Sequence, residues 1–200
     1  MWAALEILHE MGMIEPRGGG DPDLDLDLAP LTTMGSLAAA LPIDLSLTRL
    51  LAYGVIFCCA AEAIAIVAAL SLPRLPFRLV TPLVHTQPTE YNKLVSLVYK
   101  GRLHFDRGTY SEPLGMVALA CELSAMHASH ASAATLSRWC TDHGLSLRAI
   151  KQMQSTMCNL QRVLCKQLGL PKSDVELAHG RDFPGRGGQA AFNLARLRAL

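Results

Sequence analysis

The sequence predicts a mainly α-helical protein, and three observations support this fold class. Alanine and leucine dominate a chain of 200 residues, of which 50% are hydrophobic and only 6% aromatic. Those residue types favour helices over strands. Apolar side chains recur at helical spacing in several segments, and glycines and prolines separate these segments. The length is sufficient for one domain, or two small ones, with a hydrophobic core.

The first segment, residues 1–44, predicts part of a winged-helix unit. Residues 2–13 have the apolar stripe of an amphipathic helix. A glycine run precedes residues 21–28, where aspartates alternate with leucines and predict a short edge strand or a solvated loop. A calcium loop is an alternative, but the stretch lacks the central glycine and terminal glutamate that such a loop needs. Helix, turn, short β-hairpin and helix together would form the second half of a winged-helix unit.

Residues 31–73 are the stretch around which we expect the chain to be organised. A turn leads into an apolar helix over 36–41, which Pro42 ends. A second helix follows, with Asp44 and Ser46 as candidate caps, and a third apolar helix covers about 61–70. The last two helices are apolar nearly all round, so the sequence predicts that they are buried.

A membrane-spanning segment is the alternative for this stretch. Glu62 is the only charged residue between Arg49 and Arg74, and a long uncharged run is typical of a span. A carboxylate near the middle of the bilayer would be costly, however. We therefore expect two short buried helices and no membrane contact.

The second half of the chain predicts further helices and a polar tail. We expect helices over 89–103 and 114–127, a turn at 104–110 between them, and a loop or weak helix over 128–135. A long helix should run from a cap at Ser146 to Leu168 and stop at Gly169. Its apolar face would carry Ile150, Met153, Met157, Leu160 and Leu164. Residues 171–189 predict a linker, and a new helix begins at 190–200.

Several short motifs resemble the helicase-associated region of DEAH/RHA-type RNA helicases. They are Leu-Pro-Ile-Asp at 41–44, Gly-x-x-Phe-x-Cys at 54–59, Trp-Cys at 139–140 and Leu-Ser-Leu-Arg at 145–148. The resemblance covers about residues 3–170. It departs from the family at Pro113, where a histidine is usual after the helix start, and at His143-Gly144, which replaces an Asn-Phe pair.

The resemblance implies a fold and a division of the chain. Residues 1–44 would be the winged-helix part, and residues 45–170 a helical-bundle, ratchet-like domain. Residues 171–200 would be a linker and the start of a helix leading toward an oligonucleotide-binding (OB) fold.

The resemblance also implies a function. Such enzymes are ATP-driven translocases that move 3′ to 5′ on RNA, and this accessory region would help hold single-stranded RNA and couple its movement to the motor. The partners would be RNA, the RecA-like motor domains and the OB-fold. ATP and magnesium would act in those motor domains. The chain itself has neither the G-x-x-x-x-G-K-[ST] loop nor an Asp-Glu-x-His tetrad, so we expect no catalytic residue and no cofactor in it. The alternative is a helical scaffold or assembly subunit of a ribonucleoprotein complex that has no motor.

Two groups of basic residues are the candidates for contact with RNA phosphates. A net charge of +1 indicates that any such contact is local. Phosphate contacts need only cations and hydrogen-bond donors facing the strand. Alternatively, each of these residues could simply lie on a solvated helix face without binding RNA. The first group is Lys93, Lys100, Arg102 and Arg107, with Ser111, and the second is Arg138, Arg148, Lys151 and Arg162.

Histidines and cysteines suggest one further site. His127-x-x-His130 and Cys140-x-x-His143 have spacings that can hold zinc. Composition alone often supplies such pairs, so we expect no metal site. Most of the six cysteines fall within apolar helical patterns, which predicts buried free thiols and an intracellular, reducing compartment.

Overall fold

The computed structural model describes residues 2–15, 29–81 and 85–177. Helices make up 70% of it, with isolated β-bridges as the remaining pairing, which confirms the prediction of a mainly α protein. In chain order the helices are α1 (Trp2–Glu10), α3 (Thr33–Ala40), α4 (Leu45–Ile56), α5 (Ala60–Leu70), α6 (Pro88–Asp106), α7 (Glu112–Ala128), α8 (Ala133–Asp142), α9 (Leu147–Leu168) and α10 (Lys172–Val175).

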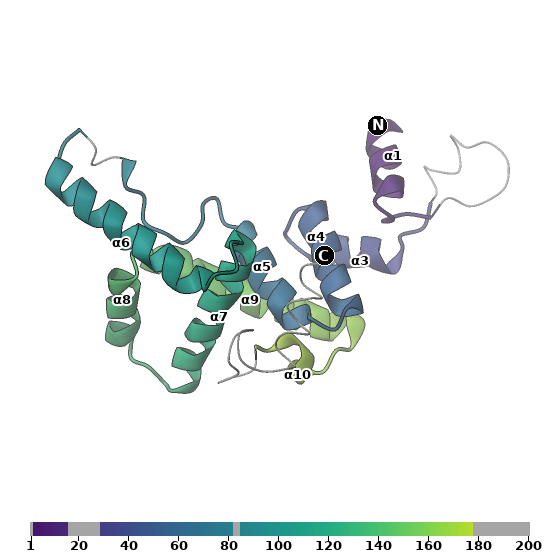
Figure 1. Cartoon of the computed structure of the whole chain (residues 1–200). Helices are drawn as coiled ribbons and strands as arrows, with labels where there is room; N and C mark the ends of the chain where they lie inside the picture. The colour runs from purple at the N-terminus through teal and green to yellow at the C-terminus, as the bar shows by residue number, and fades with distance from the viewer. Residues whose placement is uncertain (1, 16–28, 82–84, 178–200) are drawn as a thin grey trace.

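Helix α5 forms the centre of the core, as Figure 1 shows. It contacts α4, α7, α9 and α10, and all its residues except Glu62 and Leu70 are buried. Its alanines leave room for close approach: a Cβ added at Gly54 of α4 would clash with the Cβ of Ala63. The sequence prediction that both apolar helices are buried is therefore confirmed for α5 but wrong for α4, of which only Thr48, Leu51 and Gly54 are buried while Ile56 is exposed. No helix in the described part of the chain has the length and apolar character needed to cross a bilayer.

The N-terminal helix ends earlier than the sequence predicted. Helix α1 stops at Glu10, and Gly12 has φ +71°, a left-handed conformation that favours glycine. Beyond it, Ile14 and Leu31 form an antiparallel bridge, and the Thr32 amide donates to the Met13 carbonyl at 3.0 Å. The chain therefore returns alongside itself on either side of residues 16–28. The alternating stretch at 21–28 lies outside the described residues.

Helix α6 continues past its predicted end, so the turn expected at 104–110 begins only after Asp106. Phe105 is buried in the last turn, and Arg107 ends the helix in a left-handed conformation. The Asp106 carboxylate accepts hydrogen bonds from the Gly108 amide at 3.2 Å and the Ser111 amide at 3.1 Å. Those bonds hold the turn into α7. Ser111 occupies the N-cap position of α7, as predicted, but its hydroxyl makes no capping hydrogen bond.

Two other predictions for the second half are wrong in part. Helix α8 begins at Ala133, within the stretch 128–135 that was expected to be a loop or weak helix, and the Ser132 hydroxyl caps it by accepting from the Thr135 amide at 3.2 Å. Residues 171–177 are not an open linker: Val175 and Leu177 are buried, and the Gln161 side chain donates to the Val175 carbonyl at 2.9 Å. This short segment closes the core beside α5 and α9. The helix expected at 190–200 lies outside the described residues.

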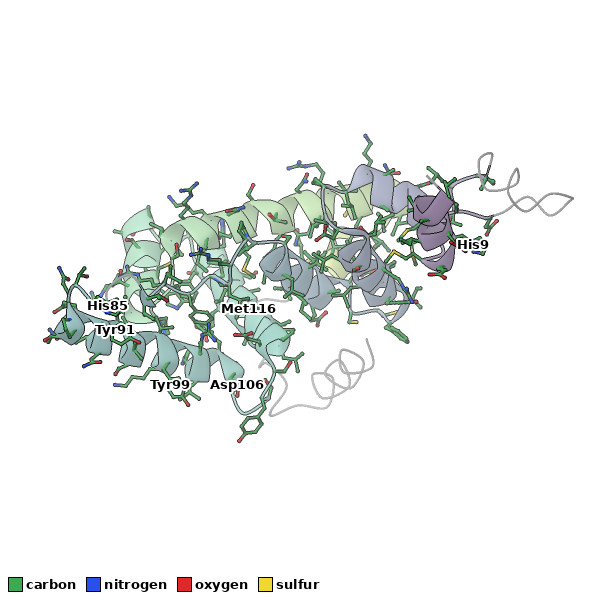
Figure 2. The ribbon with its side chains drawn as sticks, turned by 90° about the horizontal axis from the view of Figure 1, so that it is seen from above. His9, His85, Tyr91, Tyr99, Asp106 and Met116 are labelled. Atoms are coloured by element: carbon green, nitrogen blue, oxygen red, sulfur yellow. The ribbon has the colours of Figure 1, made fainter. Side chains whose placement is uncertain are left out.

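Helix α9 matches its prediction. The Ser146 hydroxyl accepts from the Ala149 amide at 3.5 Å, and Gly169 ends the helix with φ +66°. The five apolar residues expected on its inner face are all buried. Figure 2 shows α9 along one long side of the molecule and α6 along the other.

Candidate nucleic-acid interface

The junction of α6 and α7 brings together three of the predicted residues, Arg102, Arg107 and Ser111. Both arginines, however, form ion pairs with carboxylates. Arg102 forms an ion pair with Glu112 at 2.9 Å, and its guanidinium lies 5.0 Å from the centre of the Phe77 ring. Arg107 pairs with Glu122 at 2.8 Å. Since each guanidinium already has an anionic partner, this junction offers little net positive charge to a phosphate.

The Glu122 carboxylate also links this junction to a cluster of aromatic and histidine rings. Glu122 lies 2.9 Å from His104 Nε2, and the His104 ring lies 4.8 Å from that of His143. Phe105, at the centre, has its ring centroid 5.9 Å from Trp139 and 5.5 Å from His143. Aromatic pairs at these separations stabilise packing. The Trp139-Cys140 and His143-Gly144 motifs thus join α6 to α8 and to the turn that precedes α9.

Beside Arg102 lies a cavity of about 320 Å³ that the sequence did not indicate. Tyr99, which is 63% exposed, and Tyr110, which is 95% exposed, line it together with Phe77. Figure 2 shows Tyr99 and Asp106 on the α6 side of the molecule. The helical spacing of Tyr99 and Arg102 could have placed them on one face of α6. Tyr110 lies in the turn and had no such signal.

Lys100 belongs to a different surface from Arg102. Residues two apart in a helix point about 200° away from each other. Lys100 accordingly shares a shallow surface with Asn92, Lys93 and Ser96, away from the cavity. Lys93 pairs with Glu90 at 2.9 Å. The first predicted group of basic residues therefore does not form one interface.

The second predicted group is also divided. Arg138 lies on α8, where it is 87% exposed and 3.9 Å from Asp142 in an i,i+4 pair. Arg148 and Lys151 lie on the exposed side of α9. Arg162 and Lys166 lie further along that side, so four cations share it.

The exposed side of α9 is the most positively charged helix face among the described residues. The 22 residues of α9 include four cations and no aspartate or glutamate. None of the described carboxylates forms an ion pair with any of the four. Arg162 instead donates to a neutral group, the Asn159 side-chain oxygen, at 3.4 Å. We call this face, formed by Arg148, Lys151, Ser155, Asn159, Arg162 and Lys166, the α9 stripe.

The histidine and cysteine pairs do not converge on a metal. No group of three metal-binding side chains occurs in the part of the chain that the structure describes. His127 and His130 are exposed, whereas Cys140 is buried and His143 Nδ1 lies 3.0 Å from the Trp139 carbonyl oxygen. Burial raises the pKa of the Cys140 thiol, against an opposing effect from Arg78. Thiolate character at neutral pH is therefore disfavoured there.

The cysteine prediction holds only in part. Cys59 and Cys140 are buried, but Cys58 and Cys158 are exposed. Cys58 is the turn residue between α4 and α5, with φ +55°, and Cys158 lies on the outer side of α9. The apolar run around Cys58 concealed its exposure, whereas Cys158 lies outside the apolar face predicted for this helix.

No protein-family model matches the chain. Of the surfaces described above, the α9 stripe has the charge that suits an extended polyanion, and the α6–α7 junction is neutralised by its own carboxylates.

Proposed function

We propose that this chain is an RNA-binding accessory region that holds a single strand by its phosphates, as expected for the helicase-associated region of a DEAH/RHA-type RNA helicase. The observation that carries the proposal is the α9 stripe: four exposed cations on one helix with no acidic residue among them. Each phosphate contact made by a lysine or arginine releases counterions, which gives affinity without base readout.

The wider assignment follows the same proposal. Residues 1–44 would be the winged-helix part, supported by the paired backbone at Ile14 and Leu31 ahead of α3. Residues 45–170 would be the ratchet-like bundle, supported by the helices packed around α5. In this arrangement ATP and magnesium act in RecA-like motor domains, and the chain contributes RNA contact and coupling to the motor.

The test is binding of a fluorescent 12-nucleotide single-stranded RNA, followed by anisotropy across a salt series. We expect the double variant Arg148→Glu/Lys151→Glu to bind about tenfold more weakly at low salt, with a salt slope shallower by about 1.4 because two phosphate contacts are lost. The matched control is Lys100→Glu/Arg138→Glu, which reverses two exposed charges off the stripe. It should keep nearly full affinity, and circular dichroism melts check that both variants fold.

Equal losses in the two double variants would contradict the assignment to α9. Absence of salt-sensitive binding by the unchanged chain would contradict RNA binding altogether.

A second candidate function is a helical scaffold or assembly subunit of a ribonucleoprotein complex. The exposed tyrosines Tyr99 and Tyr110 beside the Arg102 cavity favour it, since tyrosine and arginine are enriched at protein interfaces. A chain that binds no RNA but whose complex is lost on Tyr99→Ala/Tyr110→Ala would support this candidate.

A further inference from the structure

The cations of the α9 stripe lie in two pairs with a neutral interval between them. Arg148 and Lys151 form the first pair and Arg162 and Lys166 the second. Positions 148, 151, 155, 159, 162 and 166 follow the three- and four-residue steps that keep side chains on one helix face. Ser155 and Asn159 occupy the interval, and both can hydrogen-bond without adding charge.

The helix fixes the distance between the two pairs. A rise of about 1.5 Å per residue separates Lys151 from Arg162 by about 16 Å and Arg148 from Lys166 by about 27 Å. Helix α9 is anchored along its whole length, because Ile150, Met157 and Leu164 are buried at its two ends and its middle. Capping at Ser146 and the stop at Gly169 define both termini. The spacing is therefore fixed by the fold of the helix.

The stripe offers no aromatic side chain for stacking with bases. Helix α9 contains no phenylalanine, tyrosine, tryptophan or histidine, so no ring on it can stack with a base. Lysine and arginine paired with phosphates position a strand but carry no direct sequence information.

We infer that the α9 stripe measures the length of the strand it binds, through two phosphate anchors that only a sufficiently long RNA can reach together. This inference rests on the proposed function. At about 3.4 Å per nucleotide, the axial spacing of one strand of a B-form duplex, a single strand needs about five nucleotides to bridge the interval and about eight to cover the whole stripe. A shorter strand occupies one anchor at a time. Joining two anchors in one ligand makes the second contact intramolecular and raises affinity well beyond that of either alone.

The test is a length series of oligouridylates of three, five, eight and twelve nucleotides, each titrated against the whole chain at several salt concentrations. We expect affinity to rise steeply between three and eight nucleotides and only slowly beyond. Between three and eight nucleotides, the slope of log K against log salt concentration should steepen from about −1.4 to about −2.8, since two phosphate contacts become four. Oligoadenylates of the same lengths should give the same step, within about threefold at each length.

Two charge-reversal variants separate the anchors. Both Arg148→Glu/Lys151→Glu and Arg162→Glu/Lys166→Glu should retain weak trinucleotide binding through the remaining pair and lose the step. Lys100→Glu/Arg138→Glu should retain the step. Equal melting temperatures by circular dichroism establish that the variants are folded.

The outcomes distinguish the inference from the function on which it rests. If the 12-mer binds with a salt-sensitive affinity but the rise with length is gradual, or only one of the two pairs affects it, the length-measuring inference is wrong and the proposed function stands. If the 12-mer does not bind at low salt, the proposed function fails and the inference with it.

Discussion

At the scale of single residues, the cysteines illustrate how surroundings set chemistry. Burial raises the pKa of the Cys121 thiol to about 11, with the Glu62 and Glu122 carboxylates adding to the shift and Arg107 opposing it. Cys158 is exposed on α9. Since the thiolate is the reactive form, the two cysteines should differ both in access and in the fraction ionised.

We therefore predict unequal alkylation by iodoacetamide at pH 8, measured by mass spectrometry. Cys58 and Cys158 should react first, and Cys121 and Cys140 at least about tenfold more slowly, because an unfavourable pKa adds to limited access. Denaturation in urea is the control and should make all six cysteines react at similar rates. Reaction of Cys121 as fast as Cys158 in the folded protein would contradict the prediction.

The raised pKa of Cys121 also determines how the stability of the fold depends on pH. The folded pKa of Cys121 lies above the unfolded value of 9.0, so the folded state favours the neutral thiol. The resulting contribution to stability is complete below pH 9 and is lost as the pH rises from 9 toward about 11. Chemical denaturation of the chain should accordingly show a decline in this alkaline interval, and a Cys121→Ala variant should show less of it.

At the scale of secondary-structure elements, glycines mark where backbones meet. Gly101 of α6 lies against the turn before α9, where an added Cβ would clash with the carbonyl oxygen of His143. Gly115 of α7 has its nearest neighbours at 3.8 Å from such a Cβ, which is ordinary contact. The two positions are both helical and buried, so they form a matched pair.

Substituting alanine at each position should shift stability in opposite directions. Gly115→Ala should stabilise by about 0.5–1 kcal/mol through helix propensity. Gly101→Ala should destabilise by about 1–3 kcal/mol, because the opposing atom belongs to the backbone and cannot rotate away. Urea denaturation measures both changes. Stabilisation by Gly101→Ala would show that α6 is not packed on the His143 turn.

Periodicity in the sequence was sufficient to predict the bounds and burial of some elements but not of others. Helix α9 was predictable from Ser146 to Gly169 because its cap, stop signal and apolar stripe are all local. The end of α6 was missed because Phe105 is buried by Phe77, Trp139 and His143, which are distant in sequence. The burial of Val175 and Leu177 likewise depends on a surface formed by α5 and α9. Tertiary contacts, rather than local preference, decide such segments.

At the scale of the whole molecule, charge is distributed more unevenly than the net value of +1 suggests. Arg102 and Arg107 are balanced by Glu112 and Glu122, and Lys93 by Glu90. The α9 stripe has no such balance. The resulting local potential, and not the net charge, should govern association with a polyanion.

The candidate site was only partly predictable from the sequence, because ion pairing depends on contacts between helices. Arg148, Lys151 and Arg162 were identified from sequence, and helical spacing places Lys166 on the same face. Pairing of Arg102 and Arg107 with carboxylates depends on how α6 meets α7, which no local pattern reveals. Tyr99 and Tyr110 share a cavity through the same junction.

Lysine acetylation footprinting tests the central claim most directly. The chain has lysines on the stripe, Lys151 and Lys166, and exposed lysines on α6, Lys93 and Lys100. If the outer face of α9 binds RNA phosphates, an eight-nucleotide single strand should slow acetylation of Lys151 and Lys166 by about tenfold at low salt and leave Lys93 and Lys100 unchanged. Protection of the α6 lysines without the α9 lysines would contradict the claim.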